Sequence, residues 1–209
     1  MQRILIVLGH PASGRYSHAL ADRYAAGARA AGAAVEVLDL ATLDFDPDLR
    51  SGQDVEQPLE PDLERASHSI LAADHLVFFF PMWWAGPPAL LKGFIDRVFL
   101  PDFAFRYPPG SSIPEGLLRG RSARLVVTMD SPGWYYRFVR RRALHHAFSG
   151  GTLKFCGIGP VRETTVTSLH TLPAAKRERW LDRLEAQGLR DAERLAPKGA
   201  PRQLRAPAE

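Results

Sequence analysis

Residues 9–17 (GHPASGRYS) form the first of three segments whose side chains could act on a ligand. They separate an apolar run from a helical pattern, and the free amides and dipole of a helix N-terminus favour an anion. Further donors are the side chains of His10, Ser13, Arg15 and Ser17. The segment predicts an anion site, with phosphate as the obvious anion, and an ordinary strand–helix turn is the alternative.

The same segment approaches two nucleotide-binding motifs without matching either. Gly9 and Gly14 have the spacing of a P-loop, but Arg15 and Tyr16 stand where the P-loop needs its Lys and Ser/Thr. The Gly-x-Gly-x-x-Gly pattern of dinucleotide-binding folds is also absent from this turn. The segment is therefore neither a P-loop nor a dinucleotide-binding turn, and the expected anion would be bound by its loop amides and polar side chains.

The second segment, residues 81–88 (PMWWAGPP), places two tryptophans in a loop framed by prolines. Large apolar side chains in a surface loop favour a contact surface. The planes of Trp83 and Trp84 are suited to cover a flat aromatic ligand. The alternative is that both tryptophans anchor the core or an interface.

The third segment, residues 128–136 (TMDSPGWYY), combines small and polar residues with two tyrosines. Tyr135 and Tyr136 are possible proton donors, with plain packing as the alternative, and His145 or His146 can titrate near neutrality. Two adjacent histidines on a helix point in different directions, and no other metal-ligand spacing occurs, so no metal site is predicted. Cys156 lies in an apolar stretch and is expected to be a core residue.

Alternating strand and helix patterns must position these segments. Apolar, β-branched runs predict strands over residues 4–8, 34–40, 75–80, 124–128 and 161–167. Amphipathic patterns predict helices over residues 17–31 (with Ser17 as the N-cap), 62–72, 89–99, 134–148 and 173–195. Residues 44–61 and 101–120 are expected to be irregular. The alternation predicts a doubly wound α/β domain with a parallel sheet, whose ligands bind at the carboxyl ends of the strands.

Composition is that of one globular domain. The 209 residues are 45% hydrophobic and 24% charged, which excludes wholesale disorder and coiled coil. A single cysteine excludes an intrachain disulfide framework. We expect one domain over residues 1–195, a loose basic tail rich in Pro and Ala over residues 196–209, and a cytoplasmic location, because neither a spanning segment nor a signal-peptide layout is present.

The net charge is +4, and its densest cluster is Arg137, Arg140, Arg141 and Arg142. A solvated helix face and an anion-facing surface are the two interpretations of this cluster. No nucleic-acid-binding motif accompanies it, so binding to nucleic acid is not expected.

Together, the motifs resemble the NAD(P)H:quinone oxidoreductase family, the flavodoxin-like group that includes DT-diaphorase. The resemblance covers roughly residues 3–167, and the matching stretches keep the family's order. They are Ile4–Pro11, Ala73–Phe78, Phe80–Trp84, Gly86, Pro88, Leu91–Phe94, Asp96–Phe99, Phe103–Phe105, Leu118–Arg121 and Leu153–Ile158. The resemblance implies a flavodoxin-like fold with five parallel strands in the order 2-1-3-4-5.

The resemblance also implies a flavin, FMN or FAD, with NADPH or NADH as hydride donor. Three matching segments would hold it. The phosphate segment is His10 with Ser13, Arg15, Tyr16 and Ser17. The loop along the ribityl chain and ring is Pro81, Met82, Trp83, Trp84 and Ala85. The loop at the pyrimidine edge is Thr128, Met129, Asp130 and Ser131.

Catalysis and assembly follow from the same resemblance. Phe105 and Tyr107 match aromatics that reach the partner subunit's substrate pocket, which implies a homodimer with shared sites; Trp83 and Trp84 would complete that pocket. Tyr136 matches a tyrosine near the reacting end of the flavin. The family's active-site histidine aligns near Arg142, so His145 or His146 could replace it only if the helix shifts.

Two departures concern the ring-binding loops. Trp83 stands where the family has a glutamine, and Asp130 brings a carboxylate that could repel an anionic reduced flavin unless it faces away or caps the next helix.

The expected activity is two-electron, ping-pong hydride transfer through flavin N5 to quinones or similar planar acceptors. An azo- or nitro-reductase on the same scaffold is one alternative. A regulatory or electron-transfer flavoprotein docked on a protein partner, such as a membrane protein, is the other.

Overall fold

A five-stranded parallel sheet forms the centre of the molecule in a computed structural model that describes residues 1–50, 52 and 57–195. The strands are β1 (Arg3–Leu8), β2 (Ala34–Asp39), β3 (His75–Pro81), β6 (Ser122–Thr128) and β7 (Val161–Val166). Their order is β2-β1-β3-β6-β7, and every neighbouring pair is parallel. The predicted flavodoxin-like order is confirmed. The predicted tail over residues 196–209 lies outside the described residues.

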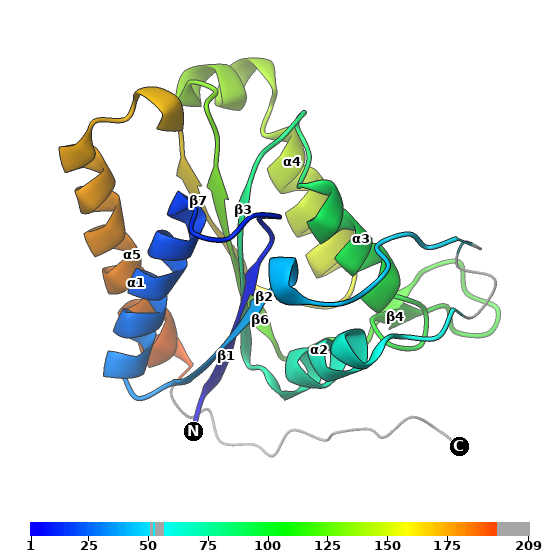
Figure 1. Ribbon diagram of the computed structural model, residues 1–209. Helices are drawn as coiled ribbons and strands as arrows, with labels where there is room; N and C mark the ends of the chain where they lie inside the picture. The colour runs from blue at the N-terminus through cyan, green and yellow to red at the C-terminus, as the bar shows by residue number, and fades with distance from the viewer. Residues whose placement is uncertain (51, 53–56, 196–209) are drawn as a thin grey trace.

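Helices cover both faces of this sheet (Figure 1). One layer holds α1 (Tyr16–Ala30) and α5 (Ala174–Arg194), and the other holds α2 (Pro61–Ala72) and α3 (Ala89–Val98). Alternate residues of the apolar runs enter opposite cores: Ile4 and Ile6 pack under α1, while Leu5 and Val7 join the core that includes α2 and α3. Because both faces are covered, the buried strands are apolar throughout rather than alternating.

Helices α1 and α5 approach each other at two glycines. A Cβ atom on Gly27 would overlap the Glu185 carbonyl group, and one on Gly188 would overlap the Tyr24 carbonyl group. Both obstacles are backbone atoms, so neither can move aside without shifting a helix.

We therefore expect Gly188→Ala to lower the free energy of unfolding by about 3 kcal/mol, as overpacking does in a rigid interior. Gly150→Ala is the matched control. Nothing lies within 4 Å of a Cβ on Gly150, so alanine there should raise stability by about 0.5 kcal/mol through its lower unfolded-state entropy. Urea denaturation of both variants measures the difference, and equal stabilities would show that the helices slide apart freely.

A buried charged network ties α5 to the sheet. Asp191 is 1% exposed and accepts hydrogen bonds from Nε and Nη2 of Arg124 (2.5 and 3.0 Å) and from the Tyr24 hydroxyl (3.0 Å). Arg124 also donates to the Thr164 hydroxyl (2.9 Å). His75 Nε2 lies 3.6 Å from the Asp191 carboxylate. These groups come from α1, β3, β6, β7 and α5, so the network joins one helical layer to three strands.

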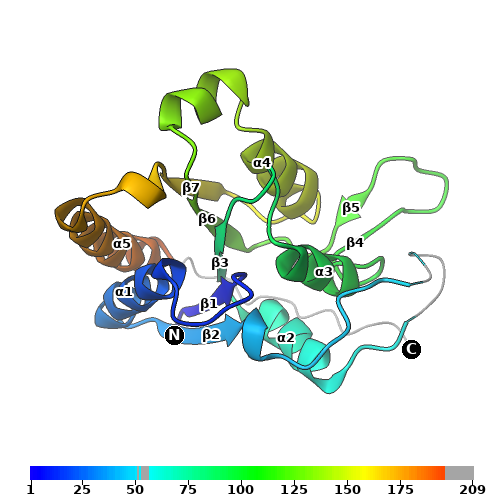
Figure 2. The ribbon, with the colours of Figure 1, turned by 45° about the horizontal axis from the view of Figure 1, so that its top comes forward.

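The segment expected to be irregular, residues 101–120, contains a short hairpin. Strands β4 (Phe105–Arg106) and β5 (Glu115–Gly116) pair antiparallel, and Arg106 forms an ion pair with Glu115 at 2.9 Å. Figure 2 shows the hairpin reaching out from the body beyond α3. Two-residue strands carry too little periodicity to be predicted, so the expectation was wrong for these four residues.

The single helix predicted over residues 134–148 is also wrong. A wide, π-helical turn at Tyr135–Val139 ends where Arg141 and Arg142 adopt left-handed backbone angles (φ 48° and 54°). The chain then continues as α4 (Ala143–His145) and a second π-helical segment at His146–Lys154. An ion pair between Arg142 and Glu163 on β7 holds the break in place.

Among the described residues, no helix is both long and apolar enough to cross a lipid bilayer.

Candidate active site

A cavity of about 230 Å³ opens at the carboxyl ends of β1, β3 and β6, where all three predicted segments meet. Its lining residues are His10, Arg15, Tyr16, Ser17, Pro81, Met82, Trp83, Thr128, Met129, Asp130 and Leu169. Ten of these are predicted cofactor residues. Leu169 was missed because a single aliphatic residue in a turn gives no functional signal of its own.

The loops around the cavity are tied to the sheet by one backbone bond each. The Gly9 amide donates to the Phe79 carbonyl (2.8 Å), the Met82 amide to the Thr128 carbonyl (2.8 Å) and the Met129 amide to the Val166 carbonyl (2.9 Å). Each bond prolongs the pairing of neighbouring strands by one step. The floor of the cavity is therefore continuous with the sheet.

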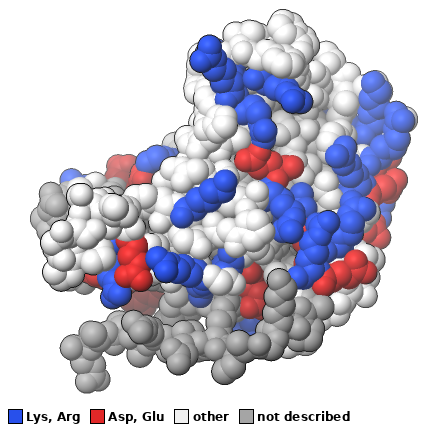
Figure 3. Space-filling model, turned by 180° about the vertical axis from the view of Figure 1, so that it is seen from behind, with Lys and Arg blue, Asp and Glu red and all other residues white. Residues whose placement is uncertain are grey.

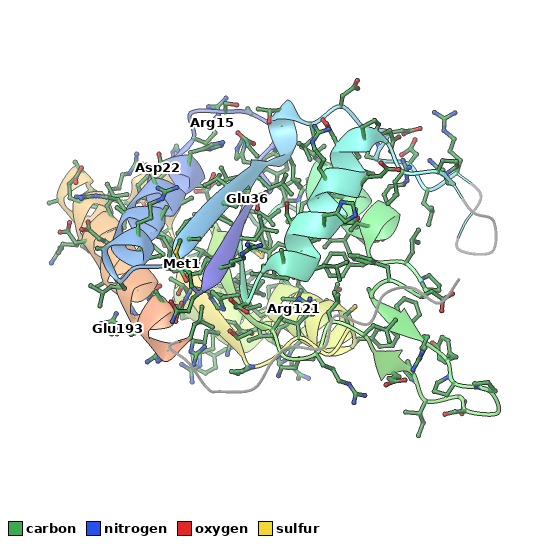
Figure 4. All side chains as sticks on the ribbon, turned by 90° about the horizontal axis from the view of Figure 1, so that it is seen from below. Met1, Arg15, Asp22, Glu36, Arg121 and Glu193 are labelled. Atoms are coloured by element: carbon green, nitrogen blue, oxygen red, sulfur yellow. The ribbon has the colours of Figure 1, made fainter. Side chains whose placement is uncertain are left out.

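The first loop delivers the N-terminus of α1 to the cavity. Figure 4 shows Arg15 at the start of this helix, away from Met1. Ser17 was predicted to cap the helix, and this is wrong: the helix begins at Tyr16, and the ring of His18 accepts the Arg15 amide at 3.3 Å. The His10 ring accepts the Ala12 amide (2.9 Å) and packs edge-on against Trp83. Burial, followed by the nearby Arg15 charge, lowers the pKa of His10.

Because Ser17 does not cap the helix, its hydroxyl is buried without a hydrogen-bond partner among the described residues, although Ser17 lines the cavity. Buried polar groups are almost always hydrogen-bonded, so an orphan points to a missing ligand. Arg15 lines the same cavity, and the N-terminus of α1 brings the positive end of its dipole there. This donor set fits a phosphate group, which is the part of a flavin nucleotide that the sequence assigned to this loop.

The second loop contains a strained turn. Trp83 and Gly86 exchange two backbone hydrogen bonds (3.0 and 2.8 Å), and the two residues between them, Trp84 and Ala85, both have positive φ (50° and 62°). This is the geometry of a two-residue type I′ turn, which favours Asn and Gly. A bulky residue in that position is held there at an energetic cost, which is typical of ligand-binding loops. The turn leaves the Trp84 side chain fully exposed.

The third loop bonds through its carboxylate to the turn that follows β7. Asp130 lines the cavity, and its Oδ1 accepts the His170 amide at 2.8 Å. Asp130 therefore does not cap the helical segment that follows it, which was one of the two expectations, but caps a turn from a distant part of the chain.

Tyr136 and His145 meet behind this loop. The Tyr136 hydroxyl shares a hydrogen bond with His145 Nδ1 (2.6 Å), and His145 Nε2 lies 3.2 Å from the Thr165 hydroxyl. Burial, followed by the charges of Arg142 and His146, lowers the pKa of His145 to about 4, so the ring is neutral at physiological pH. Burial likewise raises the pKa of Tyr136. The left-handed break at residues 141–142 brings His145 to this tyrosine.

Several predicted residues lie elsewhere. His146 is exposed and does not join the pair, and Ser13, Ser131 and Trp84 are not part of the cavity lining. Thr165 was missed because a threonine inside a strand pattern gives no functional signal.

Phe105 and Tyr107 line a different cavity, of about 420 Å³, between α3 and the segment 144–156. Ala85 and Gly86 line its rim, together with Phe99, Phe148 and Phe155. The predicted substrate-pocket aromatics are thus separated, within one chain, from the loop predicted to bind phosphate. Cys156 is buried in this wall, where burial raises the pKa of its thiol to about 11, so the predicted core role is confirmed.

The arrangement of three loops on a flavodoxin-like sheet has counterparts in known proteins. The profile of the flavodoxin-like fold family matches residues 2–187. The chain belongs to this family. A Haemophilus influenzae member named as an uncharacterized NAD(P)H oxidoreductase is 30% identical over 183 residues, which are 85% of this chain and 90% of that protein.

Two further relatives widen the comparison. Rat NAD(P)H dehydrogenase [quinone] 1 is 26% identical over 213 residues, covering 88% of this chain and 77% of the rat protein. The solved structure of Smu.1420 from Streptococcus mutans has 31% identity and a TM-score of 0.77, covering 90% of this chain and all of that one. The resemblance to the NAD(P)H:quinone oxidoreductase family is therefore confirmed.

Proposed function

We propose that this protein is a flavin-dependent NAD(P)H oxidoreductase that reduces quinones or similar planar acceptors. The observation that carries the proposal is the unpaired, buried Ser17 hydroxyl beside Arg15 at the start of α1, in a cavity bordered by Trp83 and Met82. When bound, a flavin supplies reversible two-electron transfer between a hydride donor and an acceptor. The relatives' names support NAD(P)H as donor and, for the rat protein, a quinone as acceptor.

The residues of this chain would then bind the flavin and orient it. The α1 N-terminus, Arg15 and Ser17 would hold the phosphate, and the strained turn at Trp84 and Ala85 would bind the ring. The amides of those two residues donate no hydrogen bond within the described part of the chain, so they are available to polar atoms of a ring edge. Asp130 is kept off the ring by its bond to the His170 amide.

Tyr136 is the proposed proton donor to the reduced acceptor. Its hydroxyl lies 2.6 Å from Nδ1 of the neutral His145 ring, and Nε2 of that ring lies 3.2 Å from the Thr165 hydroxyl. The ring of Tyr136 is buried, and its hydroxyl accepts the His145 amide (3.3 Å). These contacts hold the donor oxygen at one position beside an uncharged ring.

Phe105 and Tyr107 are proposed to serve the site of a second subunit. Tyr107 lies in the β4–β5 hairpin and is exposed, whereas Phe105 supports the hairpin from beneath, buried against Phe155 of its own chain. Neither residue lines its own chain's phosphate cavity. A homodimer in the cytoplasm, with each hairpin completing the partner's pocket, accounts for this separation. Sedimentation should then give twice the chain mass of 23.2 kDa, whereas a monomer with full activity would contradict the shared site.

The proposed activity is tested by the absorption spectrum of the protein reconstituted with FMN or FAD. Under anaerobic conditions, NADPH or NADH should bleach the bound flavin, and a quinone should restore it. An azo dye in place of the quinone tests the related reductase activity. A bound flavin that stays oxidised with both donors would favour an electron-transfer role, and failure to bind either flavin would refute the proposal.

Ser17→Ala provides a separate test of the phosphate site. Loss of a hydrogen bond to a charged group should weaken flavin binding by roughly 10- to 100-fold. The apo-protein should be as stable as the original or slightly more so, because a buried, unpaired hydroxyl is removed. Ser67→Ala is the control, because the buried Ser67 hydroxyl already donates to the Leu63 carbonyl (2.8 Å). This variant should be less stable than the original protein and should bind flavin with unchanged affinity. Unchanged flavin affinity in Ser17→Ala would exclude Ser17 from the site.

A further inference from the structure

Residues 134–141, here called the aromatic–arginine turn, expose an unusual set of apolar side chains. Trp134, Phe138 and Val139 are 64%, 70% and 55% exposed. Figures 1 and 2 show this turn standing above the carboxyl edge of the sheet, apart from the helical layers. Large apolar groups gathered on a projecting turn mark an interaction surface rather than ordinary surface variation.

The charged side chains of the turn itself are all basic. Arg137, Arg140 and Arg141 are exposed on the same turn. From residue 131 to residue 162 the chain has no Asp or Glu, whereas it has six basic residues: Arg137, Arg140, Arg141, Arg142, Lys154 and Arg162. Figure 3 shows Lys and Arg side chains over the upper lobe of the molecule, with acidic groups only below it. The partner of this surface must therefore be anionic.

The turn is held in its outward position by buried contacts. Tyr136, its one buried residue, bonds to the Pro132 carbonyl through its amide (3.0 Å) and to His145 through its hydroxyl (2.6 Å). The Arg142–Glu163 ion pair closes its end. Because the backbone is fixed from beneath, the exposed side chains project without an ordering step on binding.

Aromatic rings and guanidinium groups alternate on the projecting face. Arg137 lies over the Phe138 ring (5.6 Å) and Arg140 over the Tyr135 ring (5.7 Å). Tryptophan and phenylalanine are suited to the boundary between lipid headgroups and acyl chains, and arginine to the headgroup phosphates. The turn thus combines, within eight residues, the two components by which peripheral proteins bind membranes.

We propose that the aromatic–arginine turn docks this protein on the surface of an anionic lipid bilayer. Trp134 and Phe138 would enter the interface, while Arg137, Arg140 and Arg141 bind phosphates. A protein partner is less suited, because a stable protein–protein interface takes roughly 20–30 residues on each side and a projecting turn offers few. The proposal rests on the exposed side chains of the turn and not on its buried Tyr136, and it goes beyond the flavin chemistry.

Vesicle co-sedimentation of the full-length protein tests this docking. Phosphatidylcholine vesicles containing phosphatidylglycerol should bind the protein, with affinity falling as salt is raised, and pure phosphatidylcholine vesicles should bind it far less. Arg137→Gln/Arg140→Gln should weaken binding to the anionic vesicles by about 30-fold, since each basic side chain near such a surface contributes about a fivefold factor. Trp134→Ser/Phe138→Ser should weaken it by at least about tenfold, with tryptophan fluorescence no longer shifting on binding.

Matched controls separate the turn from general charge. Arg179→Gln/Arg190→Gln removes two exposed arginines of α5, and Ile113→Ser removes an apolar side chain that is equally exposed on the hairpin. Both should bind vesicles like the original protein. Equal losses in the control and turn variants, or equal binding to neutral and anionic vesicles, would overturn the proposal.

Two other outcomes would also overturn it. Binding to a DNA duplex that needs the same arginines, without vesicle binding, would assign the turn to nucleic acid. A change of sedimentation mass in Trp134→Ser/Phe138→Ser would instead assign it to contact between copies of the chain.

Discussion

Replacing Asp191 with asparagine is expected to lower the free energy of unfolding by about 3–5 kcal/mol, because it leaves the buried Arg124 guanidinium without its counter-charge. Asp182→Asn is the control. Asp182 also pairs with an arginine, Arg23, but both side chains are largely exposed, so its loss should cost less than about 1 kcal/mol. Urea denaturation at neutral pH measures both. Similar losses in the two variants would mean that the network contributes nothing beyond a surface ion pair.

The effect of Asp191→Asn on the free energy of unfolding should depend on pH. Burial raises the pKa of Asp191, but the hydrogen bonds from Arg124 and the nearby His75 ring outweigh it and hold this pKa well below its ordinary value. A depressed carboxyl pKa stabilises the fold above the unfolded pKa of about 3.9, and the contribution is lost as pH falls below that value. The stability gap between the original protein and Asp191→Asn should therefore be constant above about pH 5 and narrow in acid. A gap that widened in acid would contradict an ionised Asp191.

Replacing Tyr136 with phenylalanine is expected to slow acceptor reduction by about 100-fold, the lower end of what a positioned proton donor contributes. Flavin content should not change, because the ring and its packing remain. Tyr135→Phe is the matched control, since it removes a neighbouring hydroxyl that makes no hydrogen bond within the described residues. Stopped-flow traces of the oxidative half-reaction supply the rates. Flavin loss, or equal rates in the two variants, would exclude Tyr136 as the donor.

The rate of acceptor reduction should also be independent of the protonation of His145. Because the pKa of His145 is lowered to about 4, the Tyr136–His145 pair keeps one protonation state between about pH 5 and 8. An inflection near pH 6.5 that vanished in His145→Gln would show that His145 titrates normally and lies open to solvent.

The sheet and its loops could be predicted because they follow from local patterns. Runs such as 4–8 and 75–80 are apolar on both faces, and only a strand covered by two layers satisfies that. Since parallel strands end at one edge, the three polar segments had to meet there. Ten of the fourteen predicted cofactor residues line the resulting cavity.

The remaining features depend on contacts distant in sequence. Ser17 has the right residue type for a cap, yet the helix begins one residue earlier, and the His18 ring accepts the amide of Arg15, the residue that precedes the helix. The helical pattern of residues 134–148 is broken by Arg142 pairing with Glu163, a contact that periodicity cannot reveal. That break selects His145 over His146, a choice that the sequence left open.

The three backbone bonds that tie the cavity loops to the sheet have a mechanical consequence. The Gly9, Met82 and Met129 amides form a staircase across β1, β3, β6 and β7, in which each loop is braced by the next strand along. A ligand that displaces one loop must therefore also displace the end of the neighbouring strand to which that loop is bonded. The floor of the site is therefore braced as one unit across four strands, whereas the turn at Trp84 and Ala85 is closed by bonds between Trp83 and Gly86 of the same loop.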